Sequence, residues 1–170
     1  MSDNGSALFL AGPPGAGKTT LARSICRRLQ RLESGIAMHI ELDNIRHIVL
    51  DEAEQPGSTS GIWLELAVAL GVRAQEVARW IVVEGLFYSP EELALLSNVF
   101  PSAVLVELDI SLEICLERNC RRDDRREILE NEEVKRLWGH RRVGPWNKID
   151  ATDPIEMLTD RLAVLMGGWG

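Results

Sequence analysis

One short segment constrains the fold of this chain more than any other, GPPGAGKT at residues 12–19. It matches the pattern GxxxxGK(S/T), which forms a phosphate-binding loop when it lies between a β-strand and an α-helix. The apolar run Ala7–Ala11 precedes the segment, and apolar residues recur after it at the spacing of one helix face. The sequence therefore predicts a strand, a phosphate-binding loop and a helix that runs from about Lys18 to Glu33.

The residues of this loop have expected roles in binding a nucleoside triphosphate. Its glycines let the backbone bend so that several N–H groups point at one anion, and the start of the helix adds a positive dipole end. We expect Lys18 to reach the β- and γ-phosphates, Thr19 to bind Mg²⁺ and Thr20 to contact the α-phosphate region. The predicted cofactors are ATP and Mg²⁺. The predicted nucleotide-binding residues are Gly12, Pro13, Pro14, Gly15, Ala16, Gly17, Lys18, Thr19 and Thr20.

Segments of strand character alternate with helical segments along the rest of the chain, which is typical of an α/β domain with a parallel sheet. Further strands are expected at 37–42, 80–83, 104–108 and 147–151. Helices are expected at 43–50 and 62–79 and after Pro90, Ser111 and Pro154, with a loop at 51–60. We predict a single P-loop kinase domain over residues 1–170. Its fold is three-layer α/β/α, with a five-stranded parallel sheet and a helical, arginine-rich lid at about 118–142.

The overall composition narrows the classes of partner. The chain has 170 residues, of which 45% are hydrophobic, and this suits one globular domain. Its formal net charge of −7 disfavours general binding to the nucleic-acid backbone, although basic residues concentrate around 118–142. No apolar run reaches the roughly 20 residues that cross a membrane, and the N-terminus lacks the basic start of a secretory signal. No membrane partner is therefore expected.

The cysteines and histidines give two further expectations. Cys26, Cys115 and Cys120 form no CxxC pair, and this usage fits a reduced, cytoplasmic location. The three histidines form no ligand pair at helical spacing, so no zinc site is expected. The oligomeric state stays open.

Two features bear on whether the chain is a kinase or another kind of NTPase. Glu84 follows the apolar run Trp80–Val83, where larger NTPases place an acidic residue that holds the magnesium shell. We predict Thr19 and Glu84 as metal-binding residues, although Glu84 reads equally well as a solvated carboxylate at a strand end. The letters NKID at 147–150 match a guanine-reading motif, but no strand precedes them and no well-placed DxxG accompanies them. We therefore interpret NKID as a coincidence.

The second predicted strand runs into LDNIRH, and this segment supplies candidates for the acceptor side. Asp43 lies at the carboxyl end of that strand, on the rim where parallel-sheet proteins bind ligands, and can accept a proton from an attacking hydroxyl. Arg46 lies on the same side of the following helix and can neutralise an acceptor anion or the transferring group. The alternative is that Asp43 only caps the helix.

Residues 117–126 read ERNCRRDDRR and are strongly basic. Arg118, Arg122 and Arg125 would share one helix face, and a closing lid could bring them to the γ-phosphate during transfer. The predicted catalytic residues are Lys18, Asp43, Arg46, Arg118, Arg122 and Arg125. The alternative is a solvated helix in which neighbouring acidic residues balance the arginines. Trp146 or an arginine after the lid could stack on the nucleobase, whereas Trp63, Trp80 and Trp138 suit the core or an acceptor pocket.

These motifs resemble those of the small P-loop kinases that phosphorylate hydroxyl groups. GAGKTTLA followed by LDNIRH, together with VELDISLEICLERN, is similar to adenylylsulfate kinase. After Asn119 the chain reads CRRDDRR instead of that family's lid sequence, and there it looks like 5′-hydroxyl polynucleotide kinases. Chloramphenicol phosphotransferase-like and gluconate-kinase-like proteins share the general layout.

The resemblance implies ATP-dependent transfer of the γ-phosphate to a hydroxyl group, with Asp43 and Arg46 on the acceptor side. The expected acceptor is a small molecule, for example a nucleotide-like compound or an antibiotic. A 5′-hydroxyl polynucleotide kinase and a non-catalytic nucleotide-binding switch are the two alternatives.

Overall fold

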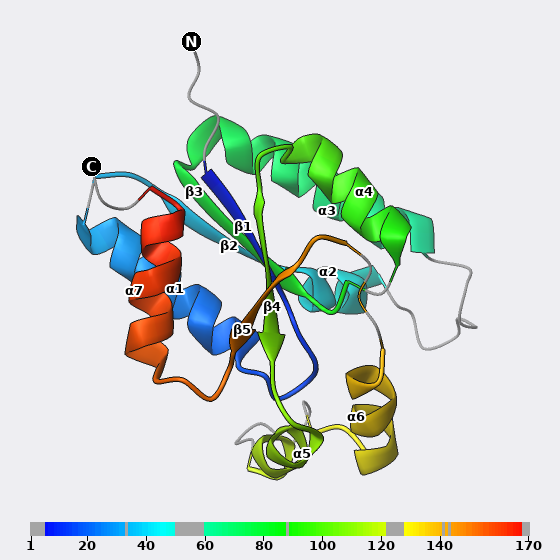
Figure 1. Ribbon diagram of the computed structural model, residues 1–170. Coiled ribbons are helices and arrows are strands. Elements are labelled where there is room, and N and C mark those ends of the chain that lie inside the picture. Colours follow the sequence, from blue (N-terminus) through cyan, green and yellow to red (C-terminus); the bar gives the residue numbers. More distant parts are fainter. Residues whose placement is uncertain are drawn as a thin grey trace.

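The computed structural model describes residues 6–32, 34–49, 60–87, 89–121, 128–140, 142 and 144–167 (Figure 1). The strands are β1 Ser6–Ala11, β2 Ala37–Glu41, β3 Trp80–Gly85, β4 Val104–Asp109 and β5 Asn147–Asp150. The helices are α1 Lys18–Leu32, α2 Leu42–Val49, α3 Ser60–Val77, α4 Pro90–Val99, α5 Leu112–Cys120, α6 Asn131–Trp138 and α7 Ile155–Leu165. The predicted alternation of strands and helices is confirmed.

The five strands form one parallel sheet, as the sequence predicts, and their order in the sheet is β2-β3-β1-β4-β5. β1 lies at the centre, where Phe9 is in register with Val83 of β3 and Leu105 of β4. Because all strands run the same way, the loop after β1, the start of α2 and the end of β4 meet at one edge of the sheet. That edge is where ligands bind in open α/β sheets.

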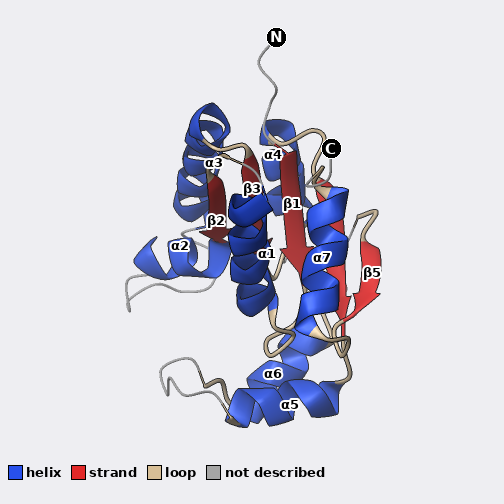
Figure 2. Cartoon of the chain, turned by 90° about the vertical axis from the view of Figure 1, so that its left-hand side faces the viewer, coloured by secondary structure: helices blue, strands red, loops and turns tan. Residues whose placement is uncertain are grey.

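The alternation of side chains along the strands divides the core into two layers. Leu8 and Leu10 of β1 face α1 and α7, whereas Phe9 faces the side covered by α2, α3 and α4. On that second side the Phe9 ring stacks on Phe87 at 5.6 Å and meets the edge of Phe100 at 5.8 Å. Figure 2 shows α1 and α7 in front of the sheet, and α5 and α6 beyond its carboxyl edge. The three-layer α/β/α prediction is confirmed.

Element ends differ from the sequence prediction by one or two residues. Helix α3 ends before Arg79, because the backbone N–H of Arg79 bonds to the carbonyl of Ile36 instead of to a helical carbonyl. β3 continues past Val83, so Glu84 lies inside the strand and pairs in register with Glu41 of β2. The letters NKID form β5 itself, which agrees with their interpretation as a coincidence.

The predicted lid is only partly covered by the described residues. α5 ends at Cys120, and α6 begins at Asn131. The side-chain amide of Asn119, fully buried, donates to the Leu129 carbonyl at 2.8 Å and accepts from the Leu129 N–H at 3.2 Å. Arg122, Arg125 and Arg141 lie outside the described residues, so the arginine-rich lid stays a prediction.

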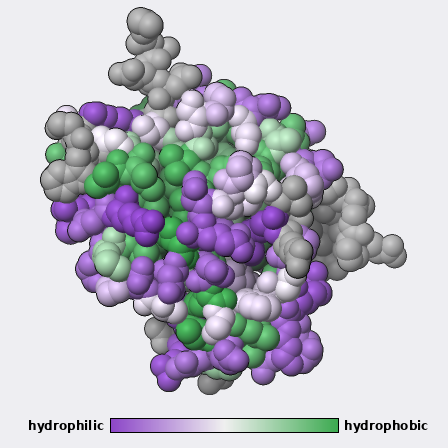
Figure 3. All heavy atoms as spheres, viewed as in Figure 1, coloured by the Kyte–Doolittle hydropathy of each residue, from purple (hydrophilic) through white to green (hydrophobic). Residues whose placement is uncertain are grey.

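The surface is mixed in polarity. Figure 3 shows hydrophilic residues across the middle of one face, with hydrophobic residues above them and, lower down, over α5 and α6. Within the described ranges, no helix combines the length and the apolar character that a membrane span needs.

Candidate functional site

The loop between β1 and α1 wraps around the side chain of Lys18. This lysine is 8% exposed, and its Nζ donates a hydrogen bond to the carbonyl of Pro13 at 3.3 Å across the loop. Gly15 and Gly17 have φ of +81° and +90°, values that side chains with a Cβ rarely adopt. The backbone thus forms the closed turn that the glycine spacing predicts, with a buried ammonium group at its centre.

Gly15 is also packed against the start of α5, which makes it the most sensitive position of the loop. A Gly15→Ala substitution would combine a left-handed backbone with a Cβ placed 2.8 Å from the Cys115 carbonyl oxygen. We expect a loss of about 2–4 kcal/mol of unfolding free energy, from backbone strain and overpacking, together with loss of nucleotide binding. Urea unfolding and nucleotide titration measure the two effects.

Gly61 provides the matched control for that substitution. A Cβ at Gly61 would meet nothing within 4 Å, so Gly61→Ala should leave the stability unchanged or slightly raised, by up to about 1 kcal/mol. Equal unfolding free energy and equal nucleotide binding of the two variants would show that the close approach of the loop to α5 is not needed for stability or binding.

A buried carboxylate lies directly behind the loop. Glu84 is 1% exposed, and its Oε1 lies 3.3 Å from His39 Nε2 on the neighbouring strand. Burial opposes ionisation of Glu84, but hydrogen bonds from His39 and Thr19 and the charge of Lys18 hold its pKa below the usual value. Burial and the neighbouring Glu84 charge raise the pKa of Glu41. Glu84 is therefore a charged, buried acceptor next to Thr19.

His39, Glu41 and Glu84 form a group that could hold a cation. Their ligand atoms all lie within 4.8 Å of one another. Glu41 also accepts a hydrogen bond from Asn44 at 2.7 Å, and Arg23 lies 3.9 Å from it. Carboxylate and hydroxyl oxygens are the ligands that Mg²⁺ prefers, so Thr19 and Glu84 suit that ion. Sequence reasoning missed His39 and Glu41, although their i, i+2 spacing beside Glu84 places all three on one sheet face.

The opposite pKa shifts of Glu84 and Glu41 predict opposite effects of pH on stability. Because the pKa of Glu84 is lowered by folding, its contribution is present above about pH 4.5 and is lost as the pH falls through the folded pKa. The pKa of Glu41 is raised, so its contribution is present below about pH 4.5 and is lost as the pH rises through the folded pKa.

This prediction is tested by urea unfolding at about pH 4 and about pH 7 in the presence of a chelator. Glu84→Gln should lose less stability on acidification than the unmodified protein, and Glu41→Gln should lose more. A larger acid loss in the Glu84→Gln variant would contradict the assigned hydrogen bonds.

The acceptor-side candidates of the sequence analysis lie together at the start of α2. Arg46 donates hydrogen bonds to Asp43 and to Glu92 of α4, each at 3.2 Å, and its guanidinium carbon lies 4.2 Å from the Trp63 ring centroid. Asp43 is half-buried and sits in the first turn of α2, one residue inside the helix. Arg46 is thus held by two carboxylates and an aromatic face, which fixes its position beside Asp43.

Two cavities border the phosphate loop. The smaller, of about 320 Å³, is lined by Gly17 and Thr20 at the start of α1, by Arg118 of α5 and by residues of the β5–α7 connection. Arg118 donates to the carbonyls of Gly15 and Ala151, both at 3.4 Å. The structure therefore places Arg118 against the outer side of the loop.

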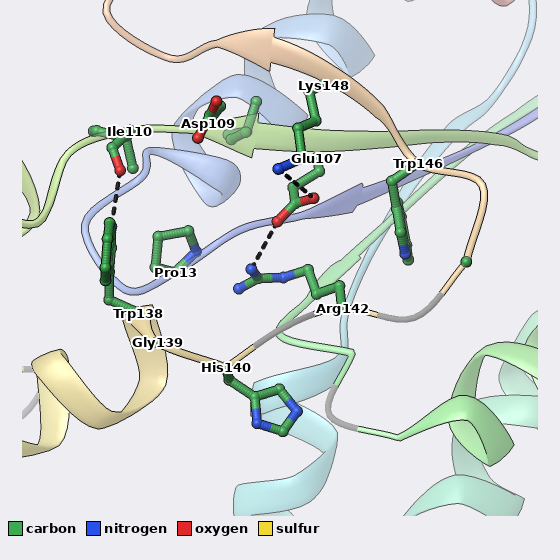
Figure 4. Close-up of a pocket in the computed structure, with 12 residues that line it drawn as sticks. Pro13, Glu107, Asp109, Ile110, Trp138, Gly139, His140, Arg142, Trp146 and Lys148 are labelled. Carbon is green, nitrogen blue, oxygen red and sulfur yellow. Dashed lines mark hydrogen bonds and ion pairs between the residues drawn. The ribbon is translucent and has the colours of Figure 1, made fainter.

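The larger cavity, of about 680 Å³, lies at the Pro13 side of the loop (Figure 4). Its other walls are the end of β4, the end of α6 and the segment that leads into β5. Trp146 lines this cavity and packs on Phe87 at 5.1 Å, whereas Trp63 and Trp80 are buried in the core. Asp43 and Arg46 are not among the residues that line it.

Sequence reasoning overlooked most of the larger cavity's polar residues. They are Glu107, Asp109, His140 and Lys148, whereas Arg142 was considered only as one of the arginines that could stack on the nucleobase. One signal was present, because Asp109 ends a buried strand at the same rim as the phosphate loop. The others come together only through the path of the chain after α6.

The sequence matches the family described as AAA domain over residues 8–142, which is most of the chain and includes the phosphate loop, Glu84 and α6. The chain belongs to the AAA domain family. No curated protein matches the sequence of this AAA domain protein significantly.

Solved structures similar to this AAA domain protein include a sugar kinase and a gluconokinase. A sugar kinase from Janibacter sp. matches with a TM-score of 0.70 and 19% identity, over 96% of this chain and 95% of that one. A gluconokinase from Sinorhizobium meliloti matches with a TM-score of 0.66 and 17% identity, over 98% and 94%. The tunicamycin resistance protein of Deinococcus radiodurans matches with a TM-score of 0.65 and 18% identity, over 96% of both chains. At these identities the similarity shows the fold, that of small P-loop kinases.

Proposed function

We propose that this protein transfers the γ-phosphate of ATP to a hydroxyl group of a small molecule, with the help of Mg²⁺. The observation that carries the proposal is the position of the phosphate loop between two cavities. The smaller cavity touches the loop at Gly17 and Thr20, and the larger one touches it at Pro13. A nucleotide that enters from one side can therefore present its terminal phosphate to an acceptor on the other side.

In this proposal the donor is held by the backbone of the loop and by Lys18. Thr20 and Arg118 border the smaller cavity, where the nucleoside is expected. Lys18 gives up its bond to the Pro13 carbonyl when phosphate oxygens enter the loop, and its charge then stabilises the transferring group. A role of Arg118 in the transition state, together with Arg122 and Arg125, stays a prediction.

Thr19 and Glu84 would hold Mg²⁺, directly and through water. When bound, the ion neutralises phosphate charge and orients the terminal group for transfer. Glu84 suits this role because it is charged and its carboxylate is fixed by His39. His39 acts through Glu84 and is a positioning residue in this scheme.

The acceptor hydroxyl loses its proton during transfer, and Asp43 is the proposed base. Because Asp43 does not line the larger cavity, this role requires the reacting hydroxyl to project from that cavity toward α2. Arg46 donates a hydrogen bond to the Asp43 carboxylate at 3.2 Å. In this scheme Arg46 holds the Asp43 carboxylate in place, while Glu92 and Trp63 hold Arg46.

A transfer assay tests the proposal. Labelled γ-phosphate is followed from ATP into a panel of monosaccharides, sugar acids, nucleosides, sulfated nucleotides, antibiotics and 5′-hydroxyl oligonucleotides. We expect Mg²⁺-dependent labelling of at least one small molecule. Labelling of oligonucleotides alone would favour a polynucleotide kinase. Tight ATP binding without any transfer would favour a nucleotide-binding switch.

A further inference from the structure

The larger cavity has a chemical character of its own, which narrows the class of acceptor. It is bounded by Pro13 of the phosphate loop, so a molecule inside it lies next to the transferring phosphate. Its volume of about 680 Å³ lies in the range of small-molecule sites, roughly 300–1,000 Å³. Its inner surface therefore indicates what kind of acceptor fits.

The charged side chains of the cavity balance one another. Arg142 donates to Glu107 Oε1 at 2.9 Å, and Lys148 lies 4.0 Å from Glu107 Oε2. Glu107 thus already pairs with both cations. The carboxylate of Asp109 makes no ion pair or hydrogen bond with the rest of the described chain. An acceptor with its own phosphate or carboxylate would meet repulsion from Asp109, and the arginine and the lysine among the described lining residues already pair with Glu107.

Arg142 provides a buried donor that reaches into this cavity. Its side chain is 3% exposed, and Figure 4 shows the guanidinium between Glu107 and Pro13. Its Nε is buried and has no hydrogen-bond partner among the described residues. An unpaired buried N–H costs about 1–3 kcal/mol, so a hydroxyl group that reached this guanidinium would be bound favourably.

Two indole rings form opposite ends of the cavity. Figure 4 shows Trp138 at one end and Trp146 at the other, with Glu107 and Arg142 between them. The Trp138 ring is fixed, because its Nε1–H donates to the Ile110 carbonyl at 2.8 Å. Trp146 is supported by Phe87. Fixed aromatic faces suit the C–H faces of a saturated ring, while hydroxyls bond to the groups between them.

We propose that this cavity binds a neutral, polyhydroxylated acceptor, such as a sugar or a cyclic polyol. Hydroxyl groups both donate and accept, so they can pair with the Asp109 carboxylate and with the Arg142 guanidinium at once. The proposal rests on the phosphotransfer function proposed above, because it identifies the acceptor of that reaction.

The test measures binding without transfer, in the presence of Mg²⁺ and a non-hydrolysable ATP analogue. Calorimetric titration compares glucose, N-acetylglucosamine and myo-inositol with gluconate, glucose 6-phosphate and a 5′-hydroxyl oligothymidylate. We expect at least one neutral polyol to bind about tenfold or more tightly than any of the anions. Tighter or equal binding of an anion, or no binding of any neutral polyol, would overturn the proposal.

Variants then locate the bound molecule. Asp109→Asn should weaken polyol binding about tenfold or more and leave affinity for the ATP analogue unchanged, because it removes a charged acceptor of hydroxyl hydrogens. Glu113→Gln, an exposed carboxylate of α5 that does not line the cavity, is the matched control. Unchanged polyol binding in Asp109→Asn would place the acceptor elsewhere.

Measuring both binding and transfer distinguishes the assignment of the cavity from the proposed phosphotransfer function. A protein that binds a neutral polyol in the cavity but never phosphorylates it would contradict the proposed function alone. A protein that phosphorylates only anionic acceptors would keep the proposed function and contradict the assignment of the cavity.

Discussion

A Lys18→Met variant is expected to lose phosphoryl transfer by a factor on the order of 10²–10³. Lys18 is buried inside the loop, and its ammonium group bonds to the Pro13 carbonyl. A charge enclosed in this way acts in a low-dielectric setting, where it stabilises developing phosphate charge far more than it would in water. Methionine has a similar length and no charge, so it isolates the electrostatic contribution from the packing.

Single-turnover transfer at saturating ATP measures this loss, and thermal unfolding checks that the variant is folded. Lys135→Met is the matched control, because Lys135 is exposed on α6 and pairs only with Glu132 among the described residues. Retention of more than about a tenth of the transfer rate by the Lys18→Met variant would contradict a role for Lys18 at the γ-phosphate.

An Asp43→Asn variant is expected to lose transfer by about 10²–10⁴-fold while it still binds ATP nearly normally. Asparagine preserves the shape of the aspartate side chain, although the hydrogen bond between this side chain and Arg46 is altered. The asparagine amide cannot take a proton from a hydroxyl. Arg46 stays in place in this variant, because Glu92 and Trp63 also hold it. The loss should therefore appear in kcat more than in the KM for ATP.

Asp160→Asn is the matched control for this experiment. Asp160 is an exposed residue of α7 that pairs with Arg28 on the opposite side of the sheet from α2. Full activity of Asp43→Asn would exclude Asp43 as the base. Asp109→Asn would then be assayed next, since Asp109 lines the cavity beside the loop.

The donor half of the site follows from the sequence because it is local. The loop, Lys18 and Thr19 lie in one short stretch, and the spacing of Gly15 and Gly17 indicates the backbone turns that the structure contains. The parallel five-stranded sheet and the three layers could also be predicted from the sequence, since the alternation of strands and helices is typical of this architecture. Glu84 was found from the apolar strand that precedes it.

The larger cavity, which we propose as the acceptor site, could not be predicted to the same degree. Glu107 and Arg142 form a partly buried ion pair across a wide gap in sequence, and neither residue type indicates burial by itself. Trp138 and Trp146 are recognisable as aromatic, but only the path of the chain after α6 brings them to the two ends of one cavity. Contacts of this kind depend on tertiary packing and leave no periodic signal.

The lining of the larger cavity comes from a few separate chain segments, and this affects how mutation can change the acceptor specificity. Most of its side chains come from the end of β4 and from residues 138–148, whereas the phosphate loop contributes only Pro13. If the cavity binds the acceptor as proposed, substitutions in those two segments will alter the acceptor without touching the residues expected to bind ATP. A mutational path from one substrate to another could then keep the expected ATP-binding residues intact throughout.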